Sequence, residues 1–443
     1  AAAHAEGDIH IHDKDFYMLT ETCCQIDIIK LFKGGFSTGH GYLREPNSIQ
    51  SYAALACIAI QANQNEMHGG QSIPNFDYAM AQGVKKTFRK EYLQALEIIL
   101  RAACRLSADE AKQLIGEIKQ NLPVPGLGNG EQFKKELSGF LSGKGISGAE
   151  EMHAQAYDIA WGKTDEATHQ AMEALIHNLN TMNSRAGAQV PFSSINYGTD
   201  TSPEGRMVVR NLLLATDEGL GSGETPIFPV QIFKVKEGIN YNPGDPNYDL
   251  FKLAIKTSAK RLFPNFSFLD APFNLAYYKE GDYNSEVAYM GCRTRVIGNV
   301  HDRTREVTCG RGNLSFTSIN LPRIGIEAKG DLDKFFAMLD ERMELVFRQL
   351  LHRFKIQCSK KVRNYPFLMG QGIWLGSDEL GPDDTVGEVL KHGTLSVGFI
   401  GLAETLKALI GKHHGESEEA QKLGLEIVGF MRKKADEQSQ KTR

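Results

Sequence analysis

Cys292 is the residue whose surroundings point most directly to chemistry. It stands between Gly291 and Arg293 in the stretch Tyr-Met-Gly-Cys-Arg-Thr-Arg-Val. Glycine permits backbone angles and close approaches that other residues resist, so a cysteine after it can sit at the tip of a tight loop. The adjacent guanidinium would lower the pKa of the thiol and attract an anionic substrate. Taken alone, however, a free cysteine is more often a small buried core residue.

Two further cysteines, Cys23 and Cys24, are neighbours in the sequence. Vicinal cysteines do not easily form a disulfide with each other, so one can face a distant partner while the other packs. Cys292 is the candidate for that partner. The glycine-rich run at residues 32–41 can expose backbone N–H groups to a phosphate, but it lacks the spacing of a P-loop or a dinucleotide fingerprint.

Three histidines are further candidates for a site. His10 and His12 lie in the alternating segment 7–13, whose period of two predicts a strand with both imidazoles on one face. Together with Asp13 they could begin a zinc or iron site, or they could form a hydrogen-bonded polar cluster. His68 lies in the polar turn at residues 65–72, which favours a role in a site wall or a turn over a role in catalysis.

Small residues precede an expected helix near the end of the chain, at residues 393–404. Ser396, Gly398 and Gly401 belong to this segment. The start of a helix carries unpaired N–H groups and the positive end of the helix dipole, which together can hold an anion. Close packing permitted by glycine is the alternative explanation.

Hydrophobic periodicity predicts the elements that must position these residues. We expect helices over residues 48–67, 76–106, 148–183, 204–218, 249–262 and 331–361. We expect strands over residues 190–198, 226–233, 266–269 and 314–324. Strands and helices therefore interleave between residues 190 and 330, as in an α/β fold.

Composition excludes several classes of protein. The chain has 443 residues, 41% of them hydrophobic and 23% charged, which is typical of a globular protein. Its net charge of −4 gives no basic field for nucleic acid, and no run of roughly twenty apolar residues predicts a membrane span. Seven cysteines at irregular spacings, without a C-x-x-C pair, favour a reducing, cytoplasmic setting without a structural zinc site. Because the chain starts at Ala1, we expect a fragment of a longer protein.

Several motifs then coincide in order along the chain. Together they resemble the anaerobic, glycyl-radical (class III) ribonucleoside-triphosphate reductases. The resemblance implies an α/β fold, a ten-stranded α/β barrel made of two half-barrels, with the Cys292 loop as a central finger. It also implies that residues 1–443 form a single catalytic barrel domain. The motifs lie at residues 7–13, 23–24, 39–41, 44–46, 65–74, 225–229, 245–249, 290–293 and 310–323.

The resemblance also implies roles for individual residues. Cys292 is similar to the thiyl-radical cysteine, which abstracts hydrogen from C3′ of the ribose, and Cys24 to the second cysteine on the opposite face of the sugar. Asn313 matches the asparagine of the members that use formate as the reductant. The remaining candidates are expected to bind substrate rather than metal. They are His10, His12, His68, Ser396, Gly398 and Gly401, and no metal ligand is expected among residues 1–443.

Cofactors and partners follow from the same resemblance. The radical would reside on a glycine outside this segment, and zinc would bind only in a C-terminal region that is missing here, as is an N-terminal nucleotide cone. The expected partners are ribonucleoside triphosphates, deoxynucleotide and ATP effectors, a radical-SAM activating enzyme and a second copy of the chain. Helices within residues 75–185 are the candidates for the dimer and effector region.

Two other functions remain open from the sequence. One is a glycyl-radical lyase that uses the same barrel and finger cysteine on a small non-nucleotide substrate. The other is a non-catalytic nucleotide-binding subunit. Affinity for nucleoside triphosphates distinguishes the lyase from the reductase, and the reading frame downstream of Arg443 distinguishes the subunit from the enzyme.

Overall fold

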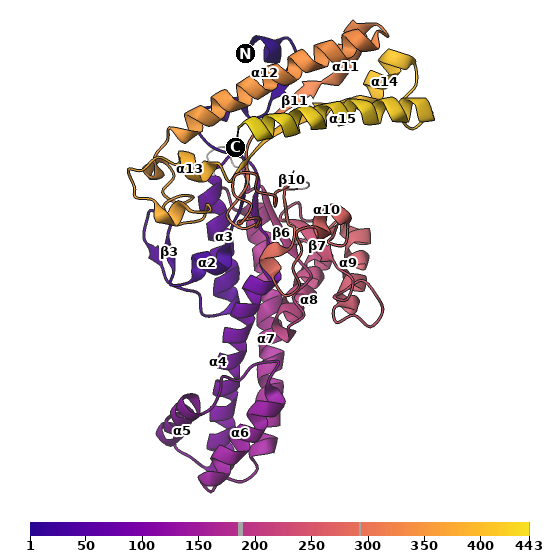
Figure 1. Cartoon of the computed structure of the whole chain (residues 1–443). Helices are drawn as coiled ribbons and strands as arrows, with labels where there is room; N and C mark the ends of the chain where they lie inside the picture. Colours follow the sequence, from indigo (N-terminus) through magenta and orange to yellow (C-terminus); the bar gives the residue numbers. More distant parts are fainter. Residues whose placement is uncertain (185–188, 292–293, 443) are drawn as a thin grey trace. The chain divides into compact units, whose positions relative to one another are not determined.

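The computed structural model describes residues 1–184, 189–291 and 294–442 (Figure 1). The chain divides into two compact units. The first unit comprises residues 1–26, 63–70 and 294–443, and the second comprises residues 27–62 and 71–293. The expectation of a single barrel domain stays a prediction.

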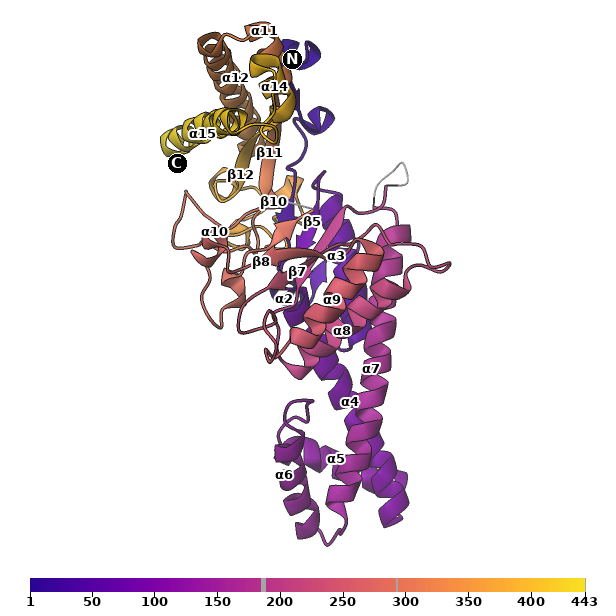
Figure 2. The ribbon, with the colours of Figure 1, turned by 90° about the vertical axis from the view of Figure 1, so that its right-hand side faces the viewer.

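Parallel strands form the centre of the second unit. Helices α8 and α9 connect successive strands, which confirms the predicted strand–helix–strand unit (Figure 2). All residues of β6 and β7 are buried, as expected for parallel strands covered on both faces. The strands are β5 (Gln71–Ile73), β6 (Ser193–Tyr197), β7 (Val230–Val235) and β8 (Asn265–Phe268), and the helices are α8 (Pro203–Glu218) and α9 (Tyr248–Arg261).

Long helices make up most of the rest of the second unit. The helix α4 (Phe76–Cys104) runs beside α7 (Ala149–Thr181), and both match the predicted helices closely. The shorter helices α5 (Ala108–Asn121) and α6 (Gly130–Gly143) pack at one end of this pair (Figures 1 and 2). The helix α3 (Ile49–Gln64) confirms the prediction over residues 48–67.

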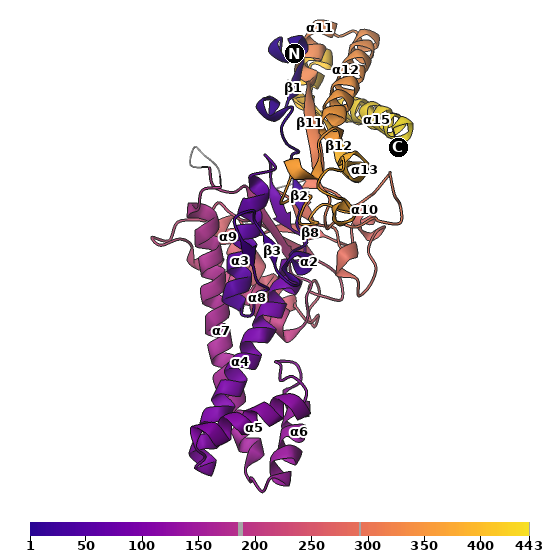
Figure 3. The same ribbon diagram turned by 90° about the vertical axis from the view of Figure 1, so that its left-hand side faces the viewer.

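The first unit contains a three-stranded sheet covered by helices on one face (Figure 3). Strand β11 lies in the middle, antiparallel to β1 and parallel to β12. The helix α12 supplies much of the core beneath the sheet. The elements are β1 (Ile9–Ile11), β11 (Asn313–Asn320), β12 (Thr394–Ile400), α11 (Leu321–Ala328), α12 (Leu332–Cys358), α14 (Leu402–Ile410) and α15 (Glu418–Lys441).

Two predictions about this unit were wrong in part. The strand predicted over residues 314–324 ends at Asn320, whose side chain accepts a hydrogen bond from the backbone N–H of Arg323 and so caps α11. Pro322 in the first turn of α11 favours the same boundary. Residues 394–400, expected only as the approach to a helix, form the strand β12 before α14 begins.

The remaining elements are short and do not change the fold class. The described part of the chain therefore has a mixed α/β fold with a parallel sheet, whereas the ten-stranded barrel stays a prediction. Among the described residues, no helix has the length and apolar character to cross a membrane. The short elements are α1 (Ala2–Ala5), β2 (Cys24–Gln25), α2 (Ile28–Phe32), β3 (Phe36–Ser37), β4 (Tyr42–Leu43), α10 (Pro272–Leu275), β9 (Tyr289–Met290), β10 (Thr294–Arg295) and α13 (Gly387–Leu390).

Candidate active site

Cys24 is fully buried in the first unit, against the backbone of the 310–313 motif. A Cβ atom at Gly312 would lie 1.8 Å from the carbonyl oxygen of Cys23 and 3.0 Å from Cα of Cys24, so only glycine fits at this position. Burial raises the pKa of the Cys24 thiol far above its usual range. At neutral pH this sulfur therefore keeps its hydrogen.

Asn313 connects the cysteine pair to strand β12. Its backbone oxygen accepts hydrogen bonds from the N–H groups of Thr22 (3.2 Å) and Cys23 (3.0 Å). Its side-chain Nδ2 donates to Oγ of Ser396 at 2.6 Å and to Oγ1 of Thr394 at 3.1 Å. The structure thus brings together Cys24, Asn313 and Ser396, three of the residues predicted to form the site.

The two faces of the three-stranded sheet have different characters. Ile9, Ile11 and Ile319 belong to the core that contains α12. Side chains alternate between faces along a strand, so the intervening residues lie on the opposite face. That face includes His10, opposite Ser318 in the register, and Ser318 is in turn opposite Gly398. We call this surface the polar sheet face; it consists of His10, His12, Phe316, Ser318, Ser396 and Gly398.

His12 is held on the polar sheet face by its neighbours. Its Nε2 lies 2.9 Å from Oγ of Ser318, and its ring centre lies 4.2 Å from that of Phe316. Burial, together with the positive charge that nearby His10 can carry, lowers the pKa of His12, so its ring is neutral at physiological pH. A neutral imidazole bonded to a hydroxyl fits the predicted role in a site wall.

Among the residues that the structure describes, no group of three or more His, Cys, Asp or Glu side chains is placed to hold a metal ion. The rings of His10 and His12 meet edge to face, with their centres 4.6 Å apart. These contacts are those of a polar cluster, and the expectation that no metal binds here stays a prediction.

The two glycines near α14 are both in close contact with neighbouring atoms. A Cβ at Gly398 would lie 2.5 Å from Cζ of Phe316. Gly401 has a φ of +71° at the N-cap of α14, and a Cβ there would lie 2.2 Å from Cγ of Pro322. Close packing thus explains both residues, and a phosphate seat at the start of α14 stays a prediction.

His68 lies in a separate cluster of the first unit. Its Nδ1 is 2.8 Å from Oγ1 of Thr20, and its Nε2 is 3.5 Å from Oδ2 of Asp13. Its ring stacks on Phe16. These contacts show a buried turn residue, and substrate binding by His68 stays a prediction.

Cys292 and Arg293 lie outside the described residues, so the predicted pairing of Cys292 with Cys24 stays untested. The chain just before them is held firmly within the second unit. Ser72 and Asn196 donate to the backbone oxygen of Tyr289, at 2.9 Å each. Gly291 has a φ of +57°, a backbone conformation that glycine adopts readily, and the tight loop predicted around Cys292 stays a prediction.

Sequence reasoning missed two buried charged residues near the cysteine pair. Arg311 is 1% exposed and donates to the backbone oxygens of Ile297, Gly298, Val307 and His392, which ties the loop after residue 294 to β11. Glu21 accepts a hydrogen bond from the hydroxyl of Tyr365 at 3.0 Å, and burial raises the pKa of its carboxyl to about 7. Charged residues are seldom fully buried, so composition gives no signal for either.

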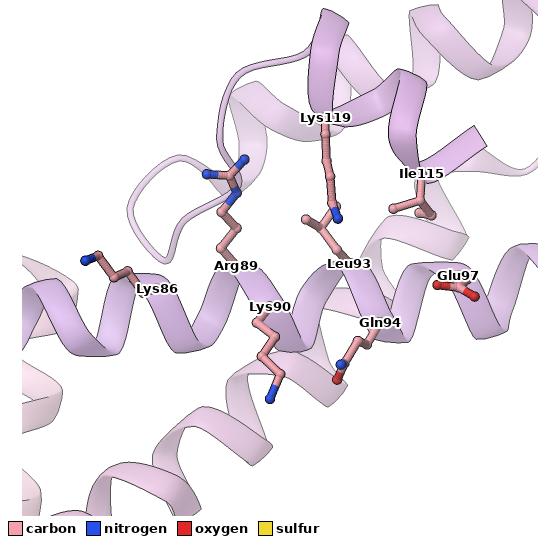
Figure 4. Close-up of a pocket in the computed structure, with 8 residues that line it drawn as sticks. All are labelled: Lys86, Arg89, Lys90, Leu93, Gln94, Glu97, Ile115 and Lys119. Atoms are coloured by element: carbon pink, nitrogen blue, oxygen red, sulfur yellow. The ribbon is translucent and has the colours of Figure 1, made fainter. Parts of the chain in front are cut away.

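A basic pocket of about 320 Å³ lies between α4 and α5 in the second unit (Figure 4). Figure 4 shows Arg89 of α4 and Lys119 of α5 extending into the gap between the two helices. Lys86, another lining residue on α4, forms an ion pair with Glu45 at 2.6 Å. Because cations outnumber the single carboxylate of Glu97 in the lining, the pocket is suited to an anion. Its lining comprises Lys86, Arg89, Lys90, Leu93, Gln94, Glu97, Ile115 and Lys119.

Comparison with known proteins identifies the family to which the chain is similar. Residues 1–443 match the family model described as "Anaerobic ribonucleoside-triphosphate reductase". The protein of that name from Salmonella typhimurium is 29% identical over 99% of this chain and 54% of its own length. The one from enterobacteria phage T4 is 28% identical over 93% of this chain and 60% of its own length. The chain therefore spans little more than half the length of these relatives.

Solved structures show a similar fold. The anaerobic ribonucleotide reductase from Thermotoga maritima with citrate in the active site has a TM-score of 0.60 and 15% identity, covering 99% of this chain and 66% of that chain. The same enzyme in complex with dATP and CTP also has a TM-score of 0.60 and 15% identity, with 99% and 61% covered.

Proposed function

The chain belongs to the anaerobic ribonucleoside-triphosphate reductase family, and we propose that the complete protein reduces ribonucleoside triphosphates to 2′-deoxyribonucleoside triphosphates by thiyl-radical chemistry. The observation that carries the proposal is the Cys24 thiol, buried beside the Asn313 motif with a strongly raised pKa. A thiol that keeps its hydrogen is a poor nucleophile and a suitable donor of a hydrogen atom.

The two predicted catalytic cysteines have different roles in this proposal. Cys292 takes a hydrogen atom from C3′ of the ribose, and Cys24 acts on the opposite face of the sugar, where the 2′-hydroxyl leaves as water. Formate supplies the two electrons and one hydrogen, and one proton is consumed, so the products are the deoxynucleotide, carbon dioxide and water. The polar sheet face, with neutral His12, forms part of the wall around the sugar.

The radical itself would come from outside the described residues. A glycyl radical, when present, supplies the unpaired electron, and a radical-SAM activating enzyme would generate it. What residues 1–443 supply is isolation: Cys24 is 0% exposed and the backbone of Gly312 packs directly against it. Water exclusion and fixed geometry favour selective radical chemistry. The ten-stranded barrel with a central finger, folded as one domain, is the architecture that we propose for the complete protein.

We expect the Asn313→Ala variant of the complete protein to use formate poorly. Asn313 is held by Ser396 and Thr394, so its amide is fixed beside the cysteine pair. A hydrogen bond to a charged group contributes about 1.5–3 kcal/mol, which predicts that kcat/KM for formate falls by one to two orders of magnitude. The measurement is the release of labelled carbon dioxide from labelled formate, in proportion to deoxynucleotide formed.

Asn320→Ala is the matched control, because Asn320 lies at the other end of the same strand and caps α11. It should lower stability without changing the KM for formate. Equal formate kinetics in the wild type and the Asn313→Ala variant would contradict the role of Asn313. Carbon dioxide release that does not track deoxynucleotide formation would contradict formate as the reductant.

We also assign the effector nucleotide to the basic pocket of α4 and α5. The pocket lies within the helical region 75–185, where the dimer and effector region is expected, and its volume suits a small ligand. Arg89 and Lys119 extend into the gap from two different helices, so they can contact one phosphate chain from both sides (Figure 4). Ile98, Ile159 and Trp161 expose apolar surface on α4 and α7 and suit a contact with a second copy.

The double variant Arg89→Glu/Lys119→Glu is expected to lose affinity for dATP by at least about tenfold, because two charge-assisted contacts are replaced by repulsion. Isothermal titration of dATP into the protein measures this. Lys112→Glu is the control, because Lys112 lies on the same helix α5 but does not line the pocket. An unchanged dissociation constant in the double variant would place the effector elsewhere.

A further inference from the structure

We propose that Asn196 is a positioning residue for Cys292: it fixes the backbone that leads into the reactive cysteine. The inference rests on the proposed function of Cys292, but it is argued from residues 72–184 and 189–291 of the second unit alone. Asn196 lies on β6 and is 0% exposed.

The side chain of Asn196 binds both backbone groups of a single residue. Its Oδ1 accepts a hydrogen bond from the N–H of Tyr289 at 2.8 Å, and its Nδ2 donates to the oxygen of Tyr289 at 2.9 Å. An amide that pairs in this way satisfies the N–H and the C=O of one residue, as the backbone of a neighbouring strand would. The two hydrogen bonds fix both the position and the orientation of the backbone at Tyr289, three residues before Cys292.

Two serines extend this attachment. Ser72 donates to the oxygen of Tyr289 at 2.9 Å and accepts from Nδ2 of Asn196 at 3.1 Å. Ser194 accepts a hydrogen bond from the N–H of Gly291 at 3.0 Å. Ser72 and Ser194 are opposite each other in the β5–β6 register, and Ser194 and Asn196 share one face of β6. Three polar side chains on two strands thus hold residues 289–291.

Gly291 completes the arrangement. A Cβ at this residue would lie 2.8 Å from Cε1 of Phe192, and its φ of +57° is one that other residues rarely adopt. The chain is therefore fixed by hydrogen bonds at residue 289 and turned at residue 291, immediately before the cysteine.

Such an attachment matters for chemistry that depends on position. Misplacing a reacting group by about 1 Å can cost roughly a hundredfold in rate. Buried, mutually bonded polar groups are also rigid, because each one loses its partner if the chain moves. The polar residues of β6 are hard to explain by stability alone, since apolar residues would fill a buried parallel strand equally well.

Asn240 provides a matched comparison. It is also 0% exposed, and its side chain makes three hydrogen bonds to the backbone: it donates to the oxygens of Gly198 and Lys234 and accepts from the N–H of Lys236. Its partners do not lead into Cys292. The variants Asn196→Ala and Asn240→Ala should therefore lose similar stability, and only the first should affect the cysteine.

The test is the rate at which iodoacetamide alkylates Cys292 in the protein without radical activation, followed by peptide mass spectrometry. We expect Asn196→Ala to raise this rate by roughly tenfold, because the segment loses its main attachment and opens locally. Asn240→Ala should leave it at the wild-type value. In the activated complete enzyme, Asn196→Ala should lower kcat while KM for the ribonucleotide stays unchanged.

Equal alkylation rates in wild type and Asn196→Ala would overturn the proposal, as would an equal rise in Asn240→Ala. If Asn196→Ala does not fold, Ser72→Ala removes one bond to the same carbonyl and should raise the rate by a smaller factor; no change there is also contrary to the proposal. The alkylation experiment is independent of turnover. Failure of the proposed function would appear instead as reductase activity in a protein without Cys292.

Discussion

Replacement of Cys292 by serine is expected to abolish ribonucleotide reduction in the complete, activated protein while leaving the fold intact. A serine hydroxyl holds its hydrogen far more strongly than a thiol does, so an oxygen at this position cannot exchange a hydrogen atom with C3′ of the ribose. The measurement is deoxynucleotide formation from each ribonucleoside triphosphate, with circular dichroism and dATP binding as checks on the fold.

Cys104→Ser is the control for this experiment. Cys104 is the last residue of α4 and is partly exposed, and no proposed role depends on it. Its replacement should leave turnover at the wild-type level. Residual turnover by the Cys292→Ser protein above that of the unactivated enzyme would remove Cys292 from the mechanism, and with it the thiyl-radical proposal.

The second prediction with a large expected effect concerns stability. It involves a buried ion pair at the ends of the parallel strands. Lys234 of β7 and Glu286 form an ion pair of 2.9 Å, with side chains 0% and 4% exposed. Asn75 also accepts from Lys234, and Thr199 donates to Glu286. We expect Lys234→Met to lower the free energy of unfolding by about 3–5 kcal/mol at neutral pH, because it leaves a buried carboxylate without its cation.

This loss should depend on pH. Burial raises the pKa of Glu286 even with its partner present, and removal of Lys234 raises it further. A carboxyl group whose pKa is raised in the folded state lowers the free energy of unfolding only at pH values at which the same group is ionised in the unfolded chain. The penalty is therefore full above the raised pKa and shrinks as pH falls towards the unfolded value of about 4.3. Urea unfolding at several pH values measures it.

The double variant Lys234→Met/Glu286→Gln is the control for the ion pair. It removes both charges, so it should recover a substantial part of the lost stability and lose the pH dependence. If Lys234→Met alone unfolds within about 0.5 kcal/mol of the wild type, the range of ordinary surface substitutions, the pair does not stabilise this sheet.

Periodicity was enough to predict the elements with strong patterns. The parallel unit of β6, α8 and β7 and the long helices α4 and α7 follow from the spacing of their apolar residues. The alternation around His10 also predicted the strand β1, in which Ile9 and Ile11 face the core and His10 lies on the other face; His12 follows the strand, with its ring centre 4.6 Å from that of His10. These features depend on local sequence alone.

Other features depend on contacts between distant residues. β12 was not predicted, because its glycines were interpreted as the approach to a helix, although Leu395, Val397 and Phe399 alternate with Ser396 and Gly398 as in a strand. Its pairing with β11 shows that this alternation is the one that matters. The burial of Arg311 results from four carbonyl groups that its loop brings together. Likewise, nothing near Asn196 in sequence indicates that its amide binds Tyr289, which is more than ninety residues away.

A crystal structure of the complete protein with a bound ribonucleoside triphosphate tests the central claim most directly. The measured quantities are the distances from the sulfur atoms of Cys292 and Cys24 to the ribose. We predict both sulfurs within about 4 Å of the sugar on its opposite faces, with the amide of Asn313 beside it. A structure in which either cysteine lies in another layer of the protein, away from the ribose, would contradict the account.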